Sequence, residues 1–92
     1  MPASQTTEIR MPAAVARAVA RATNEFLAIH PRAELGRFEV VVITEARACE
    51  VVFVPAADPG ASARGGQTSA GREMHFWIAL ADGQLLRSSF AR

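Results

Sequence analysis

The residues of this chain that could carry chemistry are few: one cysteine, Cys49, and two histidines, His30 and His75. These three side chains could hold zinc only if the fold brought them together, and neither histidine has a ligand at metal-binding spacing, so the sequence predicts no metal. A thiolate with a histidine base would give a small enzyme that uses Cys49 or His75. Because Cys49 opens an apolar segment, a small buried side chain is the simpler interpretation. His30 precedes Pro31, where a helix would end.

The carboxylates and the glycine-rich segment give no catalytic pattern. Four glutamates fall at the positions or ends of expected strands: Glu39, Glu45, Glu50 and Glu73. That placement is typical of solvated sheet edges, and no two of them have sequence support as an acid–base pair. The segment R-G-G-Q-T-S-A-G, residues 64–71, lacks the lysine of a phosphate-binding loop, and a strand rather than a helix is expected after it. The sequence thus predicts neither an enzyme nor a cofactor.

Length and composition favour one small domain. The chain has 92 residues, of which 50% are hydrophobic, and we expect a flexible arm over residues 1–11 and a single α+β domain over residues 12–92. Its net charge is +1, and the basic residues are arginines scattered without a run, so no nucleic-acid partner is expected. No apolar run approaches the roughly 20 residues of a membrane span, and no signal peptide is recognisable. With a single cysteine, the protein is expected to be cytoplasmic, without a membrane partner.

The apolar spacing near the N-terminus predicts an amphipathic helix. Pro12 suits the start of a helix and Pro31 its end, so the helix is expected from Ala13 to His30. The polar side of this helix carries Arg17, Arg21, Asn24 and Glu25. The apolar stripe, which should face the core, consists of Val15, Ala18, Val19, Ala22, Phe26 and Ile29.

Four strands are expected after the helix. Two β-branched runs, residues 37–44 and 49–55, should pair as a hairpin. Residues 56–72 have no apolar periodicity and are expected to form a long loop. A third strand over residues 73–80 and a fourth from residue 84 to about residue 90 flank Asp82-Gly83, a strong signal for a two-residue hairpin turn. The expected fold class is therefore α+β, with one N-terminal helix packed on a curled four-stranded antiparallel sheet.

The strand around Trp77 is unusual because both of its faces are apolar. One face carries Met74, Phe76, Ile78 and Leu80. A two-residue turn would place Trp77 opposite Ser88 and His75 opposite Phe90. The second face would then carry Trp77, Ala79, Leu86 and Phe90. A sheet that is apolar on both sides needs cover on both sides, and one helix cannot supply it. Either the sheet bends over itself, helped by the arm and the long loop, or another chain completes the second face. A β-bulge would shift this register.

Several segments together resemble a family of bacterial immunity proteins. They are A-V-A-R-A-T-N-E-F-L, H-P-R-A-E-L-G-R-F-E-V, E-V-V-F-V-P, the pair Gly65-Gly66 and F-W-I-A-L-A-D-G-Q-L-L-R. Such proteins have a reduced nuclear-transport-factor-like, or cystatin-like, fold, in which a helix precedes a strongly bent sheet. The resemblance implies no catalytic residues. It implies a protein that binds and neutralises a toxin.

We therefore expect a non-catalytic protein-binding module, first of all an immunity protein for a cognate bacterial toxin. The protein partner, a toxin or a second copy in a homodimer, would bind the second sheet face. The residues expected to contact it are Trp77, His75, Leu86, Phe90, Arg64 and Arg72. The alternatives are a small-ligand-binding or accessory cystatin-like domain that uses the concave side of the sheet, and a small enzyme that uses Cys49 or His75.

Overall fold

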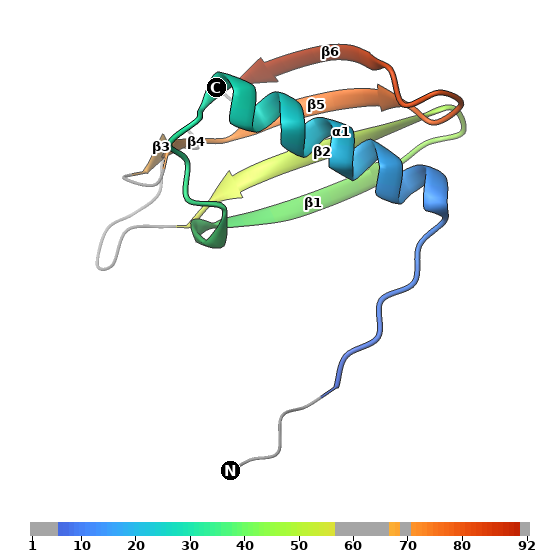
Figure 1. The fold of residues 1–92 in the computed structure, drawn as a ribbon, viewed down its shortest axis with the longest axis horizontal. Helices are drawn as coiled ribbons and strands as arrows, with labels where there is room; N and C mark the ends of the chain where they lie inside the picture. The colour runs from blue at the N-terminus through green and yellow to red at the C-terminus, as the bar shows by residue number, and fades with distance from the viewer. Residues whose placement is uncertain (1–5, 57–66, 69–70, 91–92) are drawn as a thin grey trace.

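A computed structural model describes residues 6–56, 67–68 and 71–90 of the chain. The elements are α1 (Ala13–Ile29), the 3-10 turn η1 (Leu35–Arg37), β1 (Phe38–Thr44), β2 (Ala48–Pro55), β3 (Gln67–Thr68), β4 (Gly71–Arg72), β5 (Met74–Ala79) and β6 (Leu85–Phe90). The larger sheet is antiparallel with the strand order β1-β2-β5-β6, and α1 lies across one of its faces (Figure 1). This arrangement confirms the α+β class. β1 and β6 are the two edges of the larger sheet, which is not closed.

Helix α1 forms where the prolines and the apolar stripe predict it. Pro12 is the residue before the first turn, and its carbonyl accepts hydrogen bonds from the backbone N–H groups of Val15 and Ala16. The helix ends at Ile29, and His30 follows it as the cap residue. The prediction for Ile29 was wrong: its side chain is 45% exposed, because it lies in the last turn beside an open cavity. The stripe residues that are fully buried are Val15, Ala18, Ala22 and Phe26.

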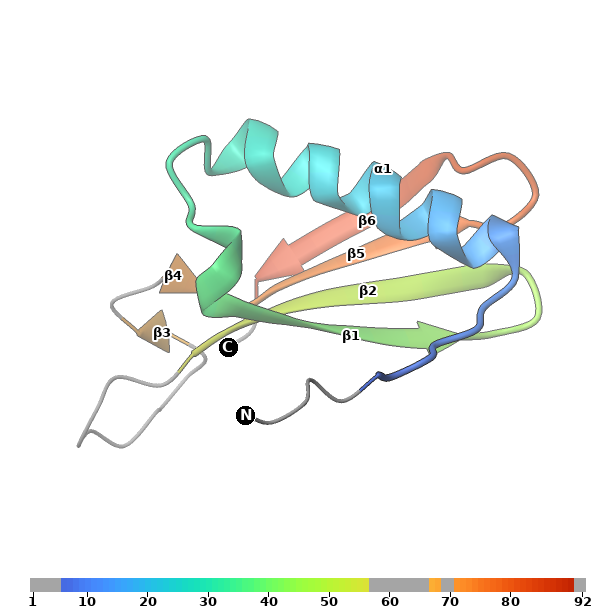
Figure 2. The ribbon, with the colours of Figure 1, turned by 60° about the horizontal axis from the view of Figure 1, so that its bottom comes forward.

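The core lies between α1 and the sheet face that α1 covers (Figure 2). Phe26 stacks on Phe53, with ring centroids 4.5 Å apart and planes 3° from parallel. Phe53 in turn meets Phe76 edge to face at 5.8 Å. Stacked and edge-to-face aromatic pairs add stability beyond the area that they bury. The strand residues packed into this core are Cys49, Val51, Phe53, Met74, Phe76 and Ile78.

The segment expected to be a long loop contains a small hairpin. β3 pairs antiparallel with β4, so that Gln67 faces Arg72 and Thr68 faces Gly71. The loop prediction was wrong for these residues, because short backbone pairing needs no apolar periodicity. The rest of the predicted loop after Ala56, residues 57–66 and 69–70, lies outside the described residues, as do residues 1–5 of the expected arm.

The turn between β5 and β6 is longer than the two residues expected. Ala79 N–H donates to the carbonyl of Gln84, and Gly83 N–H donates to the carbonyl of Ala79, so the loop between the hydrogen-bonded residues Ala79 and Gln84 contains four residues, 80–83. Gly83 has a φ of +74°, a conformation that glycine adopts without strain. A shift in register between Trp77 and Ile78 marks a bulge in the pairing with β6.

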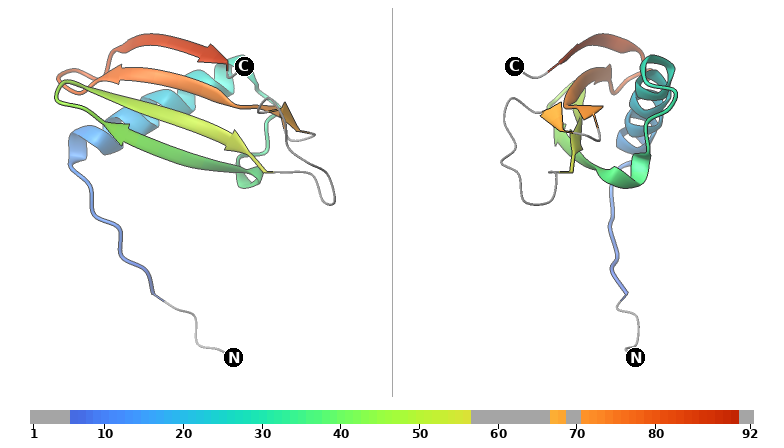
Figure 3. Two further views of the ribbon diagram at one scale, coloured as in Figure 1. Left: turned by 180° about the vertical axis from the view of Figure 1, so that it is seen from behind. Right: turned by 90° about the vertical axis from the view of Figure 1, so that its left-hand side faces the viewer.

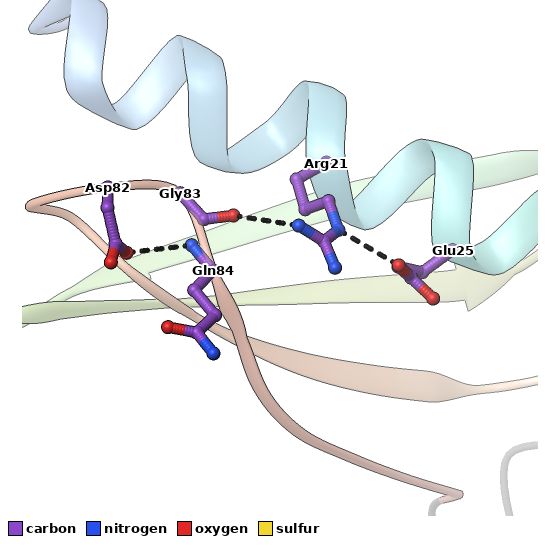
Figure 4. A network of polar contacts seen from close by, with 5 residues as sticks. All are labelled: Arg21, Glu25, Asp82, Gly83 and Gln84. Atoms are coloured by element: carbon purple, nitrogen blue, oxygen red, sulfur yellow. Dashed lines mark hydrogen bonds and ion pairs between the residues drawn. The ribbon is translucent and has the colours of Figure 1, made fainter.

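Two arginines from the side of α1 expected to face solvent hold this turn. Arg17 donates from Nη2 to the carbonyl of Leu80 at 2.7 Å, and Arg21 donates to the carbonyl of Gly83 at 3.4 Å. Arg21 also forms an ion pair with Glu25 at 2.9 Å, as Figure 4 shows. Asp82 accepts a hydrogen bond from the backbone N–H of Gln84 in the same turn. These contacts tie the helix to one end of the sheet.

Candidate functional site

The sheet face that points away from α1 has no helix over it in the described part of the chain (Figure 3). We call it the open face. Strand pairing aligns its side chains in two neighbouring rows, because alternate residues of a strand share one face. The first row runs across the sheet through Ile43, Glu50, Trp77 and Arg87. The second row runs through Val41, Val52, His75 and Ser89. The predicted placement of Trp77 on the face opposite the buried core is confirmed.

His75 lies between two carboxylates on the open face. Its Nδ1 atom is 2.6 Å from Oε2 of Glu50, and its Nε2 atom is 2.8 Å from Oε2 of Glu73. A carboxylate accepts hydrogen bonds, so both contacts are best satisfied when the imidazole is protonated and donates from both nitrogens. The three side chains are only 19–25% exposed. Glu50, Glu73 and His75 therefore form a cluster that favours a protonated imidazole at a site that solvent reaches only in part.

The pKa of His75 follows from this arrangement. Partial burial lowers it, but the hydrogen bonds to Glu50 and Glu73 and their negative charges outweigh burial, so the pKa of His75 is raised above its ordinary value of 6.5. With both ring nitrogens engaged as donors, the side chain has no free lone pair with which to accept a proton from a substrate. The arrangement therefore suits a His75 side chain that keeps its positive charge and its orientation.

Trp77 is held in place by two neighbours on the open face. The imidazole of His75 stacks on it with ring centroids 5.8 Å apart and planes 20° from parallel. The guanidinium carbon of Arg87 lies 3.9 Å from the centre of the indole ring, in cation–π contact. The indole is thus oriented in the free protein while part of its surface stays accessible.

Exposed aliphatic side chains continue the open face toward the edge strand β1. Val41 is 43% exposed and Ile43 is 44% exposed, although both belong to a sheet row that also contains a buried or half-buried side chain on β2. Glu39 on β1 and Glu45 just beyond it flank these two residues, and both are exposed. The open face therefore has an exposed aliphatic patch on its edge strand, with carboxylates beside it.

The six residues predicted to contact a partner do not form one surface. Trp77 and His75 lie together on the open face, and Leu86 is 56% exposed beside the bulge. The bulge pairs Phe90 with Met74 instead of His75, so the prediction that Phe90 shares a face with Trp77 was wrong. Phe90 instead lies near His30 and under the guanidinium of Arg72. Arg64 lies outside the described residues.

Sequence reasoning missed the partners of His75. Glu50 and Glu73 were expected to be solvated, but both are hydrogen-bonded to His75 and mostly shielded from solvent. The spacing of Glu73 and His75, two residues apart on a strand, could have suggested a shared face. The contact with Glu50 could not be read from spacing, because it depends on the register between β2 and β5.

The residues considered for catalysis and metal binding have other surroundings. Cys49 is fully buried in the core, and burial raises the pKa of its thiol, which disfavours the thiolate that a nucleophile requires. His30 follows the last residue of α1. Among the described residues, no group of three or more His, Cys, Asp or Glu side chains is arranged to hold a metal ion.

No helix in the described ranges is long and apolar enough to cross a membrane.

Comparisons of the chain with protein-family models, with curated proteins and with solved structures found no match. The resemblance to immunity proteins therefore stays an expectation from the sequence.

Proposed function

We propose that this chain is a non-catalytic protein-binding module that uses the open face, and that it serves as an immunity protein that binds and neutralises a cognate bacterial toxin. The observation that supports the proposal best is the position of Trp77. It lies on a sheet face that no described helix covers, and the same face carries the exposed side chains of Val41 and Ile43 on the edge strand β1, with β2 between them and Trp77. Exposed apolar patches on small proteins commonly mark interaction sites, and tryptophan is enriched among the residues that dominate binding energy.

The neighbours of Trp77 favour a binding role for its indole ring. Contacts with His75 and Arg87 restrict the ring before any partner arrives. An interface side chain that is already ordered loses less conformational entropy on binding. The ring therefore suits an anchor that inserts into an apolar pocket of the partner.

Charge on the open face favours a partner other than a second copy. Within the described part of the chain, Glu39 and Glu45 have no ion-pair partner, and they flank Val41 and Ile43 on the edge strand of this face. A partner with an apolar patch bordered by Lys or Arg would complement them. A second copy would bring two identical sets of carboxylates together, and like charges across an interface oppose association.

The proposal predicts that a toxin is encoded beside this gene, and the direct test is co-expression with that toxin. We expect the unchanged protein to restore growth and to bind the purified toxin, whereas Trp77→Ala should weaken binding by at least about 2 kcal/mol, as at other tryptophan hot spots. Ile9→Ala is the matched control, because Ile9 is 77% exposed and lies in the segment before α1. This variant should bind the toxin like the unchanged protein.

Two results would contradict the proposal. If the unchanged protein neither protects cells from the neighbouring toxin nor binds it, the immunity role fails. If sedimentation shows a homodimer that Trp77→Ala dissociates, the occupant of the open face is a second copy and the toxin proposal is wrong for this surface.

A further inference from the structure

A cavity of about 380 Å³ lies on the other side of the molecule, where α1 ends. Phe38, Ile29 and Ala33 form its apolar wall, and the buried ring of Phe26, which also borders the cavity, meets Phe38 edge to face at 5.1 Å. Pockets for small ligands commonly have volumes of about 300–1,000 Å³ and are lined mainly by apolar side chains. At roughly 30 Å³ per water molecule, this cavity has the volume of about a dozen waters, which suits a molecule with one or two fused rings.

The polar side chains that line this cavity include two guanidinium groups. These polar side chains are Arg32, Arg72 and His30, and none of the described lining residues carries a carboxylate. In the part of the chain that the structure describes, neither Arg32 nor Arg72 has an ion pair. The guanidinium of Arg72 lies 4.2 Å above the ring of Phe90, which fixes its plane while its N–H groups stay unpaired within those ranges.

His30, one of the lining residues, contains an unpaired polar atom. Its Nε2 is buried, and within the described residues it has no hydrogen-bond partner. A buried polar atom without a partner costs free energy, but this atom has almost no accessible surface, so the two arginines and not Nε2 are the groups that a ligand in the cavity would meet. The carboxyl end of α1 adds only about half a negative charge, which two guanidinium groups outweigh.

We propose that this cavity binds a small aromatic carboxylate. The ring system would pack against Phe38 and Ile29, and the carboxylate would accept hydrogen bonds from Arg32 and Arg72. The proposal is independent of the proposed toxin binding, because the cavity and the open face lie on opposite sides of the sheet.

The test uses two probes of the same shape, 1-naphthoate and the uncharged 1-naphthamide. Each is titrated into the full chain while backbone amide shifts are followed by NMR. We expect naphthoate to shift the amides of Ile29, Ala33 and Arg72, and to bind roughly tenfold more tightly than naphthamide, the scale of one charge-assisted contact.

Matched variants then separate charge from shape. Arg32→Gln and Arg72→Gln should each weaken naphthoate binding by roughly fivefold or more and leave naphthamide binding nearly unchanged. Both side chains are exposed, so these variants should fold, which thermal melting verifies. Arg87→Gln is the control, because Arg87 lies on the open face. It should leave naphthoate binding unchanged.

The proposal is overturned if neither probe binds, or if both probes bind equally well. It is also overturned if both arginine variants bind naphthoate as tightly as the unchanged chain, or if the shifts map to Val41, Ile43 and Trp77 instead of the end of α1. None of these outcomes bears on toxin protection, so failure here is distinguishable from failure of the proposed function.

Discussion

The two faces of the larger sheet have similar sequences but different surroundings. Both contain β-branched and aromatic residues, yet α1 buries Phe53 and Phe76 on one face, while Val41 and Ile43 on the other remain more than 40% exposed. Titratable side chains also divide between the faces. The covered face holds only the thiol of Cys49 in its buried core, whereas the open face holds the hydrogen-bonded group of Glu50, Glu73 and His75.

This difference shows which interactions each face requires. On the covered face, burial of apolar area by the helix supplies the stability, and no buried side chain is polar or charged in the described ranges. On the open face, the guanidinium of Arg87 and the imidazole of His75 orient the indole of Trp77 without burying it completely. If this face served only the stability of the fold, a second layer of secondary structure packed on it would stabilise the protein more than leaving it open.

The largest effect is expected on the covered face. Phe26→Ala removes the ring that stacks on Phe53 and should lower the free energy of unfolding by about 3–5 kcal/mol, as for other buried aromatics. Ile29→Ala, one turn along the same helix and 45% exposed, should cost no more than about 1 kcal/mol. Urea denaturation followed by circular dichroism measures both. Equal costs would mean that α1 does not separate a covered face from an exposed one.

A smaller effect is expected where α1 meets the turn between β5 and β6. Gly83→Ala should destabilise the fold by about 1–2 kcal/mol, because φ is +74° there and the new Cβ would lie 3.1 Å from Nε of Arg17. Gly36→Ala is the matched control, since a Cβ at Gly36 meets no atom within 4 Å. Its free energy of unfolding should change by less than about 0.5 kcal/mol. A harmless Gly83→Ala would show that the helix is not fixed at this end.

On the open face, Trp77→Ala should cost only about 1 kcal/mol of folding free energy, because its ring is partly exposed and contacts mainly His75 and Arg87. The same urea titration measures this cost against that of Phe26→Ala. A loss as large as the one expected for Phe26 would place Trp77 in the core. The distinction between a folding face and a binding face would then be wrong.

The sequence predicted the elements well and their contacts less well. Apolar spacing and Pro12 place α1, because the helix signal lies within one segment. The hydrogen bond between Glu50 and His75 and the bulge that moves Phe90 depend on how β5 aligns with its neighbours. Arg17 and Arg21 were expected to face solvent, yet they reach the turn at residues 80–83, because the crossing of α1 over the sheet is set by packing. The local sequence pattern carries no information about how the strands align or about how the helix crosses the sheet.

The smallest effect expected is a pH dependence confined to the open face. The pKa of His75 is raised above 6.5, so the folded state holds its proton more tightly than the unfolded state does. The stability that protonated His75 contributes is therefore complete below about pH 6.5 and is lost as the pH rises through the folded-state pKa.

The comparison that isolates this effect is between the unchanged chain and His75→Asn from pH 6 to pH 9, a range chosen to stay above the ordinary carboxylate pKa values of roughly 4. The unchanged chain should be more stable by at most about 1 kcal/mol near pH 6, the scale of an ion pair that solvent still partly screens, and this advantage should shrink as the pH rises. NMR titration of the imidazole should show a lower pKa in Glu50→Gln than in the unchanged chain, whereas Glu39→Gln should leave it unchanged, because Glu39 makes no contact with His75. An advantage that grows with pH would mean that His75 is bound in its neutral form, and the two carboxylates would then not be holding a proton between them.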